Sequence, residues 1–396
     1  MRRVALLSLA SFAISIAGCG GADGGGSNRI RGDALTVYAS LPAHGLDAEA
    51  GEAAALGMRQ ALADAGRKAG SWDIRLVVLP STRPGDERWD PGTIEANAER
   101  AGDDAKAIAY LGELDQGGSA VSLPVTNRAG ILQISPADGL TSLTRTPPGR
   151  PTAGPARYYP EGARNFARLV PPDIEAARDI VQKLRARGAR RLAVVDGARI
   201  ADRELESMVT TMIGTGLPRS VARVTVRDLD EAVDVREQAT DLAEELAAER
   251  PDAVLFASSA GPEADALLAD LATRLPGVLL WGGPPLALGI GDFSAAPAGA
   301  CAVTGLSPPA GSSRAARRLL REVRRAGASS ATAEALLGYD AMGLTLDAIE
   351  EAGADRRKVI AAVRASGPRE GMMGRYSMAA NGDPRGRRPV CLALMP

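Results

Sequence analysis

Alternating strand and helix patterns constrain the fold of this chain more than any other feature of its sequence. Short aliphatic runs such as 34–40 and 107–111 are each followed by a stretch with apolar residues at helical spacing, such as 48–66. Strands that alternate with helices in this way build a parallel sheet with helices on both faces. The sequence therefore predicts an α/β fold.

The alternation forms two series, separated by a segment with five prolines between Pro147 and Gly162. This segment predicts an irregular surface excursion. Asp173 is placed to cap the first helix of the second series. The strands are expected at 34–40, 74–79, 107–111, 131–134, 191–196, 221–226, 253–257, 278–281, 301–306, 374–378 and 390–394. The helices are expected at 48–66, 93–105, 119–129, 174–187, 203–213, 232–249, 263–275, 312–325, 331–352 and 356–365.

The first residues indicate where the protein works. Arg2 and Arg3 precede an apolar run over 4–17, which is shorter than the roughly 20 residues that cross a bilayer. A positive start, a short apolar run and a small-residue end are typical of a secretory signal peptide. The ending Ile-Ala-Gly-Cys resembles a bacterial lipoprotein box, so residues 1–18 are expected to be removed and Cys19 to be acylated. Residues 19–33, rich in glycine at 20–26, are then expected to form a flexible tether outside the cytoplasm. The alternative is ordinary secretion, in which Cys19 has no role.

Signatures of enzymes and of nucleic-acid binding are absent from the sequence. The chain has one histidine, His44, which excludes multi-histidine metal sites and leaves little scope for a Ser-His-Asp triad. It lacks the G-x-S-x-G, phosphate-loop and G-x-G-x-x-G patterns. A net charge of −1 does not favour a nucleic-acid surface. We expect no catalytic residue, no cofactor and no metal site.

Cys301 and Cys391 each lie in a short apolar segment that is expected to be a strand. Disulfides persist outside the cytoplasm, so these two cysteines could pair. The alternative is two buried free thiols, which pack as small apolar groups.

The segment 109–144, AYLGELDQGGSAVSLPVTNRAGILQISPADGLTSLT, shows a family resemblance. It is similar to the first lobe of the branched-chain amino acid (Leu/Ile/Val) binding proteins of ABC importers, which have a type I periplasmic-binding fold. Further blocks resemble the same family in the same order, at 37–42, 57–62, 166–173, 338–349 and 374–383.

The resemblance implies two doubly wound parallel-sheet lobes that are joined by hinge strands and close on a small molecule. Such hinge closure is a recognised mode of conformational switching. Lobe 1 is expected to comprise 34–168 with 307–365, and lobe 2 to comprise 169–306 with 366–396. A monomer that delivers its ligand to an ABC permease in the membrane is the implied form. Independently, open α/β sheets bind ligands at the C-terminal ends of their strands.

Aligned with this family, the chain differs at the positions that hold an amino acid. The family's carboxylate-binding and amine-binding positions fall at Gln116 and at Asp138-Gly139, and Gly117 belongs to a glycine pair that could offer backbone N–H groups to an anion. Other pocket positions fall at Ala50, Ile200, Ser259 and Pro284. Asp138 either supplies a charge for a ligand amine or is a turn residue. We hypothesise that the ligand is not a standard branched-chain amino acid.

Three functions remain open from the sequence. The first is a receptor that delivers an amino acid or a related compound to an importer. The second is a sensor or regulator that reports a ligand by the same closure. The third is a diverged member of the family that binds no ligand.

Overall fold

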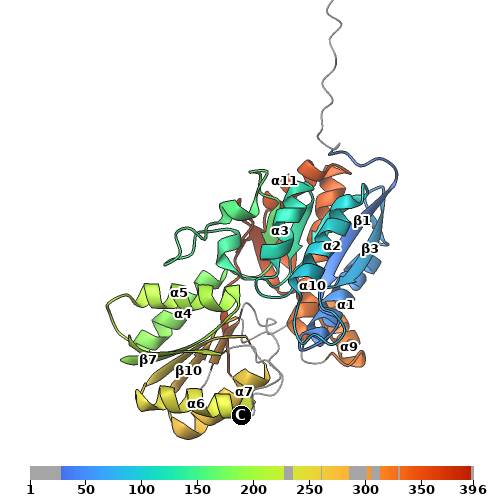
Figure 1. Cartoon of the computed structure of the whole chain (residues 1–396). Helices are drawn as coiled ribbons and strands as arrows, with labels where there is room; N and C mark the ends of the chain where they lie inside the picture. The colour runs from blue at the N-terminus through green and yellow to red at the C-terminus, as the bar shows by residue number, and fades with distance from the viewer. Residues whose placement is uncertain are drawn as a thin grey trace, which may run out of the picture.

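Two six-stranded sheets organise the chain, and the computed structural model shows each with helices packed on both faces (Figure 1). The structure describes residues 28–226, 235–259, 261–284, 301–304, 313–328 and 331–393. The predicted α/β architecture of two doubly wound lobes is confirmed. No helix in these described ranges is long and apolar enough to span a membrane.

The sheet of the first lobe has the strand order β2-β3-β1-β4-β5-β6. All neighbouring strands are parallel except β2, which forms a short antiparallel hairpin with β3. The strands are β1 (Ala34–Leu41), β2 (Lys68–Ala69), β3 (Trp72–Pro80), β4 (Ala107–Leu111), β5 (Leu132–Ser135) and β6 (Phe166–Arg168).

Helices from both ends of the chain cover this sheet. On one face, α1, α9, α10 and α11 bury an aliphatic core with β1 and β4, whereas α2 and α3 cover the other face around Tyr38 and Tyr110. Helices α1 and α10 pack closely because a Cβ on Gly57 would lie 1.9 Å from the carbonyl oxygen of Ala335. The helices are α1 (Ala48–Asp64), α2 (Pro91–Asp103), α3 (Ser119–Arg128), α9 (Arg314–Arg325), α10 (Thr332–Ala352) and α11 (Arg356–Arg364).

The sheet of the second lobe has the strand order β15-β11-β10-β9-β7-β8, and only the edge strand β15 is antiparallel. Helices α4 and α5 pack on one face and α6 and α7 on the other. The strands are β7 (Arg191–Gly197), β8 (Arg219–Val226), β9 (Ala253–Ala257), β10 (Leu279–Gly282), β11 (Cys301–Thr304) and β15 (Val390–Ala393). The helices are α4 (Asp173–Ala186), α5 (Ile200–Ile213), α6 (Val235–Ala248) and α7 (Pro262–Arg274).

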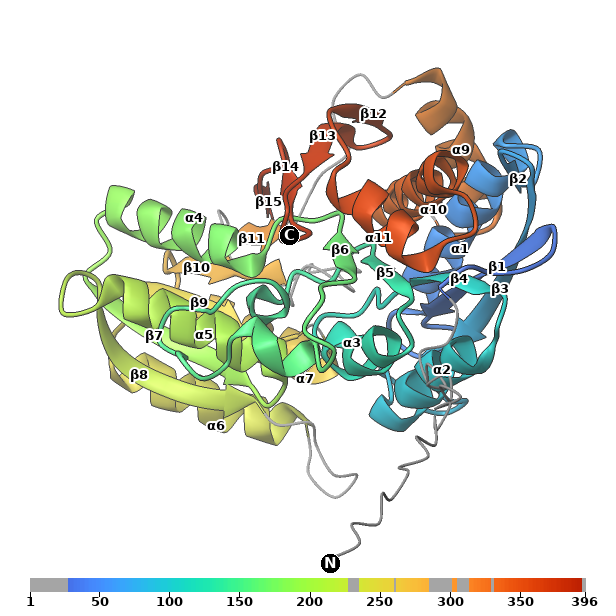
Figure 2. The ribbon, with the colours of Figure 1, turned by 90° about the horizontal axis from the view of Figure 1, so that it is seen from above.

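The described part of the C-terminal segment, 366–393, divides between the lobes, although we predicted 366–396 to belong to lobe 2. A small antiparallel sheet of β12 (Arg369–Gly371), β13 (Gly374–Met378) and β14 (Pro384–Arg385) lies beside α10 (Figure 2). Tyr376 and Met378 are buried in the core of the first lobe, and Arg387 Nη2 lies 2.6 Å from Asp340 Oδ2 of α10. Only β15 joins the second sheet. The reason is that Tyr376 and Met378, two positions apart on β13, share one face of the strand, and this face packs onto the first lobe.

Two further details differ from prediction. Asp173 does not cap α4: it is the first residue of the helix, and Pro172 stands at the cap position. The expected tether, 19–33, is fixed over its end, because Ile30 is buried and its N–H donates to the carbonyl of Ala354 at 2.8 Å. The expected signal peptide, 1–18, and Cys19 lie outside the described residues.

Cys391 is disulfide-bonded. In the antiparallel pair of β11 and β15, Cys391 lies opposite Val303 and Cys301 lies opposite Ala393. The two cysteines lie on neighbouring strands, two positions out of register, and their pairing with each other stays a prediction.

Candidate functional site

The loops at the C-terminal ends of the strands in the two lobes face each other across a cleft. Seven residues of these loops line a cavity of about 20 Å³. From lobe 1 come Asp47, Arg88, Trp89, Asp115 and Gln116, and from lobe 2 come Arg199 and Ser259. Among the described residues, the two larger cavities described below are lined by lobe 1 alone.

Strand order explains why these loops converge. In each sheet the chain adds strands first on one side of its initial strand and then on the other. Ligands bind open α/β sheets at this point of reversal, outside the C-terminal strand ends. Asp47 follows β1 and Asp115 follows β4, the two strands that flank the reversal in lobe 1. Arg199 follows β7 and Ser259 follows β9, which flank it in lobe 2.

The lobe 1 wall of the cavity carries two carboxylates. Burial raises the pKa of Asp47 above its usual range, and the nearby guanidinium groups of Arg88 and Arg199 oppose this effect. Burial also raises the pKa of Asp115 well above its usual range, and repulsion by Asp47 and Glu113 adds to the effect. Asp115 is 4% exposed, and its Oδ2 accepts a hydrogen bond from the Ser81 hydroxyl at 3.3 Å.

The lobe 2 wall carries a third carboxylate just behind Ser259. The Ser259 hydroxyl donates to Asp202 Oδ1 at 3.2 Å, and the backbone N–H of Arg199 lies 3.3 Å from Asp202 Oδ2. Burial raises the pKa of Asp202 to about 7, while the Ser259 hydroxyl, Arg199 and Arg88 oppose the rise. Because Arg88 belongs to the other lobe, the two walls interact electrostatically.

Side chains of the protein fill the space between the lobes. Arg199 Cζ lies 5.6 Å from the centre of the Trp89 ring, within the range of a cation–π contact. The lobes also touch beside the cavity: the backbone N–H of Ser142 donates to Glu204 Oε1 at 3.0 Å. A volume near 20 Å³ holds about one water molecule. A ligand must therefore displace these side chains or hold the lobes further apart.

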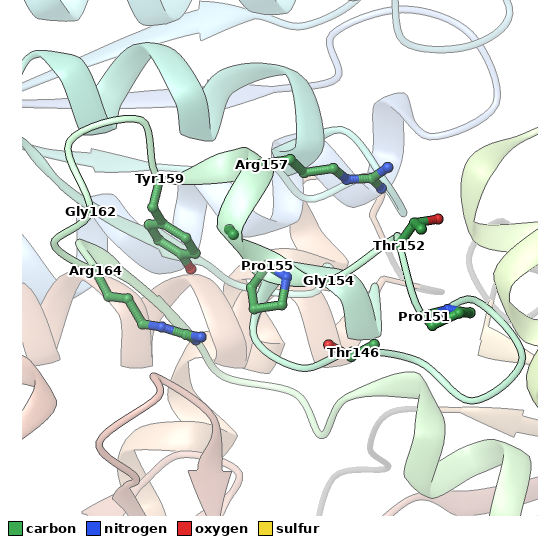
Figure 3. Close-up of a pocket in the computed structure, with 10 residues that line it drawn as sticks. Thr146, Pro151, Thr152, Gly154, Pro155, Arg157, Tyr159, Gly162 and Arg164 are labelled. Atoms are coloured by element: carbon green, nitrogen blue, oxygen red, sulfur yellow. The ribbon is translucent and has the colours of Figure 1, made fainter.

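Two larger hollows are each lined by lobe 1 alone. One, of about 660 Å³, is lined only by the proline-rich excursion between Thr146 and Arg164 (Figure 3). Within it, Arg164 is already engaged, since it lies over the Tyr159 ring and donates to the carbonyl of Thr144 at 2.9 Å. The other, of about 680 Å³, borders α1 and the loop after α9 in lobe 1. Neither hollow could report closure of one lobe on the other, which favours the cleft as the functional site.

Four of the residues predicted from sequence, Gln116, Gly117, Ile200 and Ser259, lie where the lobes meet, and two of them line the cavity. Gln116 and Ser259 line the cavity. The amide of Gln116 is bonded at both ends, because its Nε2 donates to the carbonyl of Ala137 at 2.8 Å and its Oε1 accepts from the N–H of Gly139 at 3.1 Å. Gly117 meets the other lobe, where a Cβ added to it would lie 2.6 Å from Ile200 Cγ2.

The other predicted residues do not line the cavity. Asp138 is buried and accepts hydrogen bonds from the backbone N–H groups of Ser119 and Leu140, both at 3.0 Å, so it has the role of a turn residue. Ala50 packs against the core of lobe 1, and Ile200 packs in an apolar cluster between the lobes. Gly139 contacts Asp173, and Pro284 is buried.

Sequence reasoning missed all four charged residues that line the cavity, and also Trp89. Asp47, Arg88, Trp89, Asp115 and Arg199 all lie within the loops that follow expected strands. The signal that could have found them is a charged or aromatic side chain in the loop between an apolar strand and the next helix, at the sheet edge where ligands bind.

Comparison with known proteins agrees with this geometry. A family model described as "Periplasmic binding protein" matches residues 37–395. No curated protein matches the chain. Among solved structures, the leucine binding protein LivK from Thermotoga maritima superposes with a TM-score of 0.72, at 22% identity over 91% of this chain and 95% of that one.

Two further structures show the range of similar proteins. A solute binding protein of an ABC transporter from R. palustris, in complex with benzoate, has a TM-score of 0.69 at 21% identity, over 91% of this chain and 96% of that one. The branched-chain amino acid binding protein LivJ from Streptococcus pneumoniae, in complex with isoleucine, has a TM-score of 0.67 at 16% identity, over 91% of this chain and all (100%) of that one. At these identities the likeness establishes the fold, which is the type I periplasmic-binding fold that the sequence predicts.

Proposed function

The chain belongs to the periplasmic binding protein family, a family of solute-binding proteins and not of enzymes, and from this premise we propose that it is an extracytoplasmic receptor for an ABC importer. In this proposal a small solute binds between the two lobes and stabilises their closed arrangement. A permease in the membrane then recognises the closed form and accepts the solute.

One observation carries the proposal. Side chains from both lobes, all in loops at the C-terminal ends of strands, meet around one cavity, and those of Asp47, Asp115, Arg199 and Ser259 follow the strands that flank the reversal of strand order. A solute held there would touch both lobes at once and would therefore favour closure. Ligands shift a conformational equilibrium only through such differential contacts.

The proposed ligand is an amino acid or a related small compound. The similar structures name leucine, isoleucine and benzoate as their ligands. In this chain, Gln116 uses its amide within lobe 1 and Asp138 is occupied by backbone N–H groups. These contacts support the hypothesis that the site does not take a standard branched-chain amino acid. Micromolar binding of leucine, isoleucine or valine in calorimetric titration would refute it.

We further propose that acylation of Cys19 anchors the receptor to the outer face of the cell membrane. The signal-like segment 1–18 and the small residues before Cys19 support this proposal. The Cys19→Ala variant should leave the membrane fraction, while the unchanged protein should stay there and gain the mass of a lipid. Equal partition of the two proteins would refute the anchor.

The test of solute binding has two parts. Mass spectrometry of gently isolated protein should identify a co-purifying small molecule. Small-angle scattering should then show that removal of this molecule increases the radius of gyration and that its return reverses the change. A protein with no bound molecule and an unchanged scattering curve across a metabolite panel would instead be a diverged member without a ligand.

A further inference from the structure

Given the proposal that the cleft holds the solute, we infer that this solute carries an organic cationic group other than the α-ammonium of an amino acid, an amine or a guanidinium, which binds against Trp89 among the carboxylates of Asp47, Asp115 and Asp202. The inference goes beyond receptor function by naming the class of ligand. It rests on the contact between Arg199 and Trp89 at the cavity, on the charged side chains of the cavity walls, and on the lack of a metal-binding cluster among the described residues.

The guanidinium group of Arg199 already occupies a position at the cavity that suits a cation. Arg199 extends from lobe 2 and lies 5.6 Å from the centre of the Trp89 ring of lobe 1. Aromatic faces attract cations, and desolvated sites of this kind bind ammonium ligands. Arg199 is close enough to Asp47 and to Asp202 to oppose the effect of burial on both carboxylates. A ligand cation in the same place would make the same three interactions.

Asp115 supplies the second observation, which is independent of Arg199. It lines the cavity, is 4% exposed and receives one hydroxyl hydrogen bond, from Ser81. The charged groups with the largest effect on it are two other carboxylates, Asp47 and Glu113. A buried carboxylate is costly unless it is paired. A cationic ligand group would provide the opposite charge that this side of the cavity needs.

The balance of charge also favours a cation. A bound cation would favour the ionised form of all three carboxylates, Asp47, Asp115 and Asp202, which then outnumber the two guanidinium groups, Arg88 and Arg199. Within the described part of the chain, no three His, Cys, Asp or Glu side chains converge closely enough to hold a metal ion. The cation is therefore an organic one, bound through an aromatic face and separate carboxylates.

The cavity size makes a further demand on the ligand. At about 20 Å³, the cavity cannot accept an ammonium or guanidinium compound while Arg199 lies over Trp89. The ligand must compete with Arg199 for the indole ring. Replacing Arg199 by glutamine should consequently tighten the binding of a cation, because the competitor is lost and a negative wall is left.

A ligand carboxylate that binds to Arg88 and Arg199 is the opposing hypothesis, and it predicts the reverse effect. Removal of Arg199 would then weaken binding. The Arg199→Gln variant therefore separates the two classes of ligand by the sign of its effect.

The experiment is isothermal titration of the full mature protein, stripped of bound solute, with four probes: agmatine, L-arginine, L-leucine and benzoate. Agmatine or L-arginine should bind, and L-leucine and benzoate should not. Asp115→Asn should weaken that binding by about thirtyfold or more, as expected when a charged partner at a desolvated contact is lost. Arg199→Gln should tighten it by on the order of tenfold, the scale of one charged contact.

The controls separate binding from folding. Asp103→Asn changes a carboxylate that is exposed at the end of α2 and should leave the affinity unchanged. Trp89→Phe keeps an aromatic face of lower cation affinity, so it should weaken binding even if Asp115→Asn fails to fold.

Three results would overturn the inference. The first is that neither cationic probe binds. The second is that benzoate or leucine binds and that Arg199→Gln weakens this binding. The third is that the affinity for the cationic probe is unchanged in Trp89→Phe and, if that variant folds, in Asp115→Asn. If the co-purifying molecule has no positive group, the cationic assignment is wrong but receptor function stands. If no molecule binds and scattering does not change, receptor function itself is wrong.

Discussion

The buried ion pair between Arg168 and Asp383 offers a direct test of how the chain is held where it leaves the first lobe. Arg168 ends β6 and is fully buried, with its Nε 2.9 Å from Asp383 Oδ1. Its Nη1 donates to the carbonyl oxygens of Asp138, at 3.2 Å, and Leu140, at 2.9 Å. Asp383, at 1% exposure, also accepts from the Thr144 hydroxyl at 2.8 Å.

Asp383→Asn keeps the shape of the side chain and removes its charge. Breaking a buried pair by removing one partner costs about 3–5 kcal/mol, because the other charge stays buried without compensation. The remaining carbonyl acceptors of Arg168 place the expected loss at the lower end, about 3 kcal/mol. Arg145 contributes less, because it is 38% exposed where it meets Asp383.

Urea unfolding near neutral pH measures this loss, and Asp103→Asn is the matched control. Arg168→Met should also destabilise the protein, whereas the double variant should lose less than the sum of the two single losses. If Asp383→Asn unfolds within about 0.5 kcal/mol of the control, which is the scatter of surface substitutions, the ion pair does not hold the junction.

The same pair predicts a dependence on pH. Burial alone would raise the pKa of Asp383, but Arg168, the Thr144 hydroxyl and Arg145 together lower it below its usual range. For an acid whose folded pKa is depressed, stability is present above the unfolded pKa, near 3.9, and is lost as the pH falls through the folded pKa. The Asn variant should lack this component of acid unfolding.

Three more predictions concern burial, closure and the disulfide. Burial raises the pKa of Glu113 to about 7, so its contribution should reduce stability as the pH rises from about 4.5 to about 7. Glu113→Gln should remove this loss of stability with rising pH, which amounts to up to about 3 kcal/mol in the free energy of unfolding measured with urea. An unchanged dependence of stability on pH would contradict the prediction. Gly117→Ala should increase the radius of gyration in scattering, because its Cβ would lie 2.6 Å from Ile200 Cγ2. Gly130→Ala is the control: the φ of Gly130 is +64° and that of Gly117 is +85°, so alanine strains the backbone at both positions, but a Cβ on Gly130 would meet nothing within 4 Å. The control should therefore leave the radius of gyration unchanged. Equal radii for the two variants would refute the reasoning. In Cys19→Ser protein, denatured without reductant, no thiol should react; two reactive thiols would exclude the pairing of Cys301 with Cys391.

The strands that were predicted well are those with an apolar run and a clear end. The segments 107–111 and 253–257 are found with the expected bounds, because every residue in them is buried in the middle of a parallel sheet. The strands β2, β6, β12 and β14 were missed. Each has two or three residues, too few to show a period, and β6 places the fully buried Arg168 where a pattern of burial expects an apolar residue.

Predictions of the site reached the correct loops but not the correct side chains. Gln116 and Ser259 were expected at the site and line the cavity, yet Asp115 was missed although it is the neighbour of Gln116. A sequence identifies a loop after a strand, but the side chain that enters the cleft depends on how the opposite lobe packs. Arg199 illustrates this, since its interaction with Trp89 exists only when the lobes meet.

The packing of α1 against α10 has a consequence for the order in which the protein can be completed during synthesis. The first helix of lobe 1 is covered by a helix that begins only at Thr332, whereas every strand of lobe 2 except β15 has been made by residue 304. Lobe 1, whose synthesis begins first, therefore keeps the apolar face of α1 uncovered until the final quarter of the chain has been made. Lobe 2, whose synthesis begins second, has all of its described strands except β15 before then. A released fragment that ends near residue 310 should resist protease in its second half and be cut in its first.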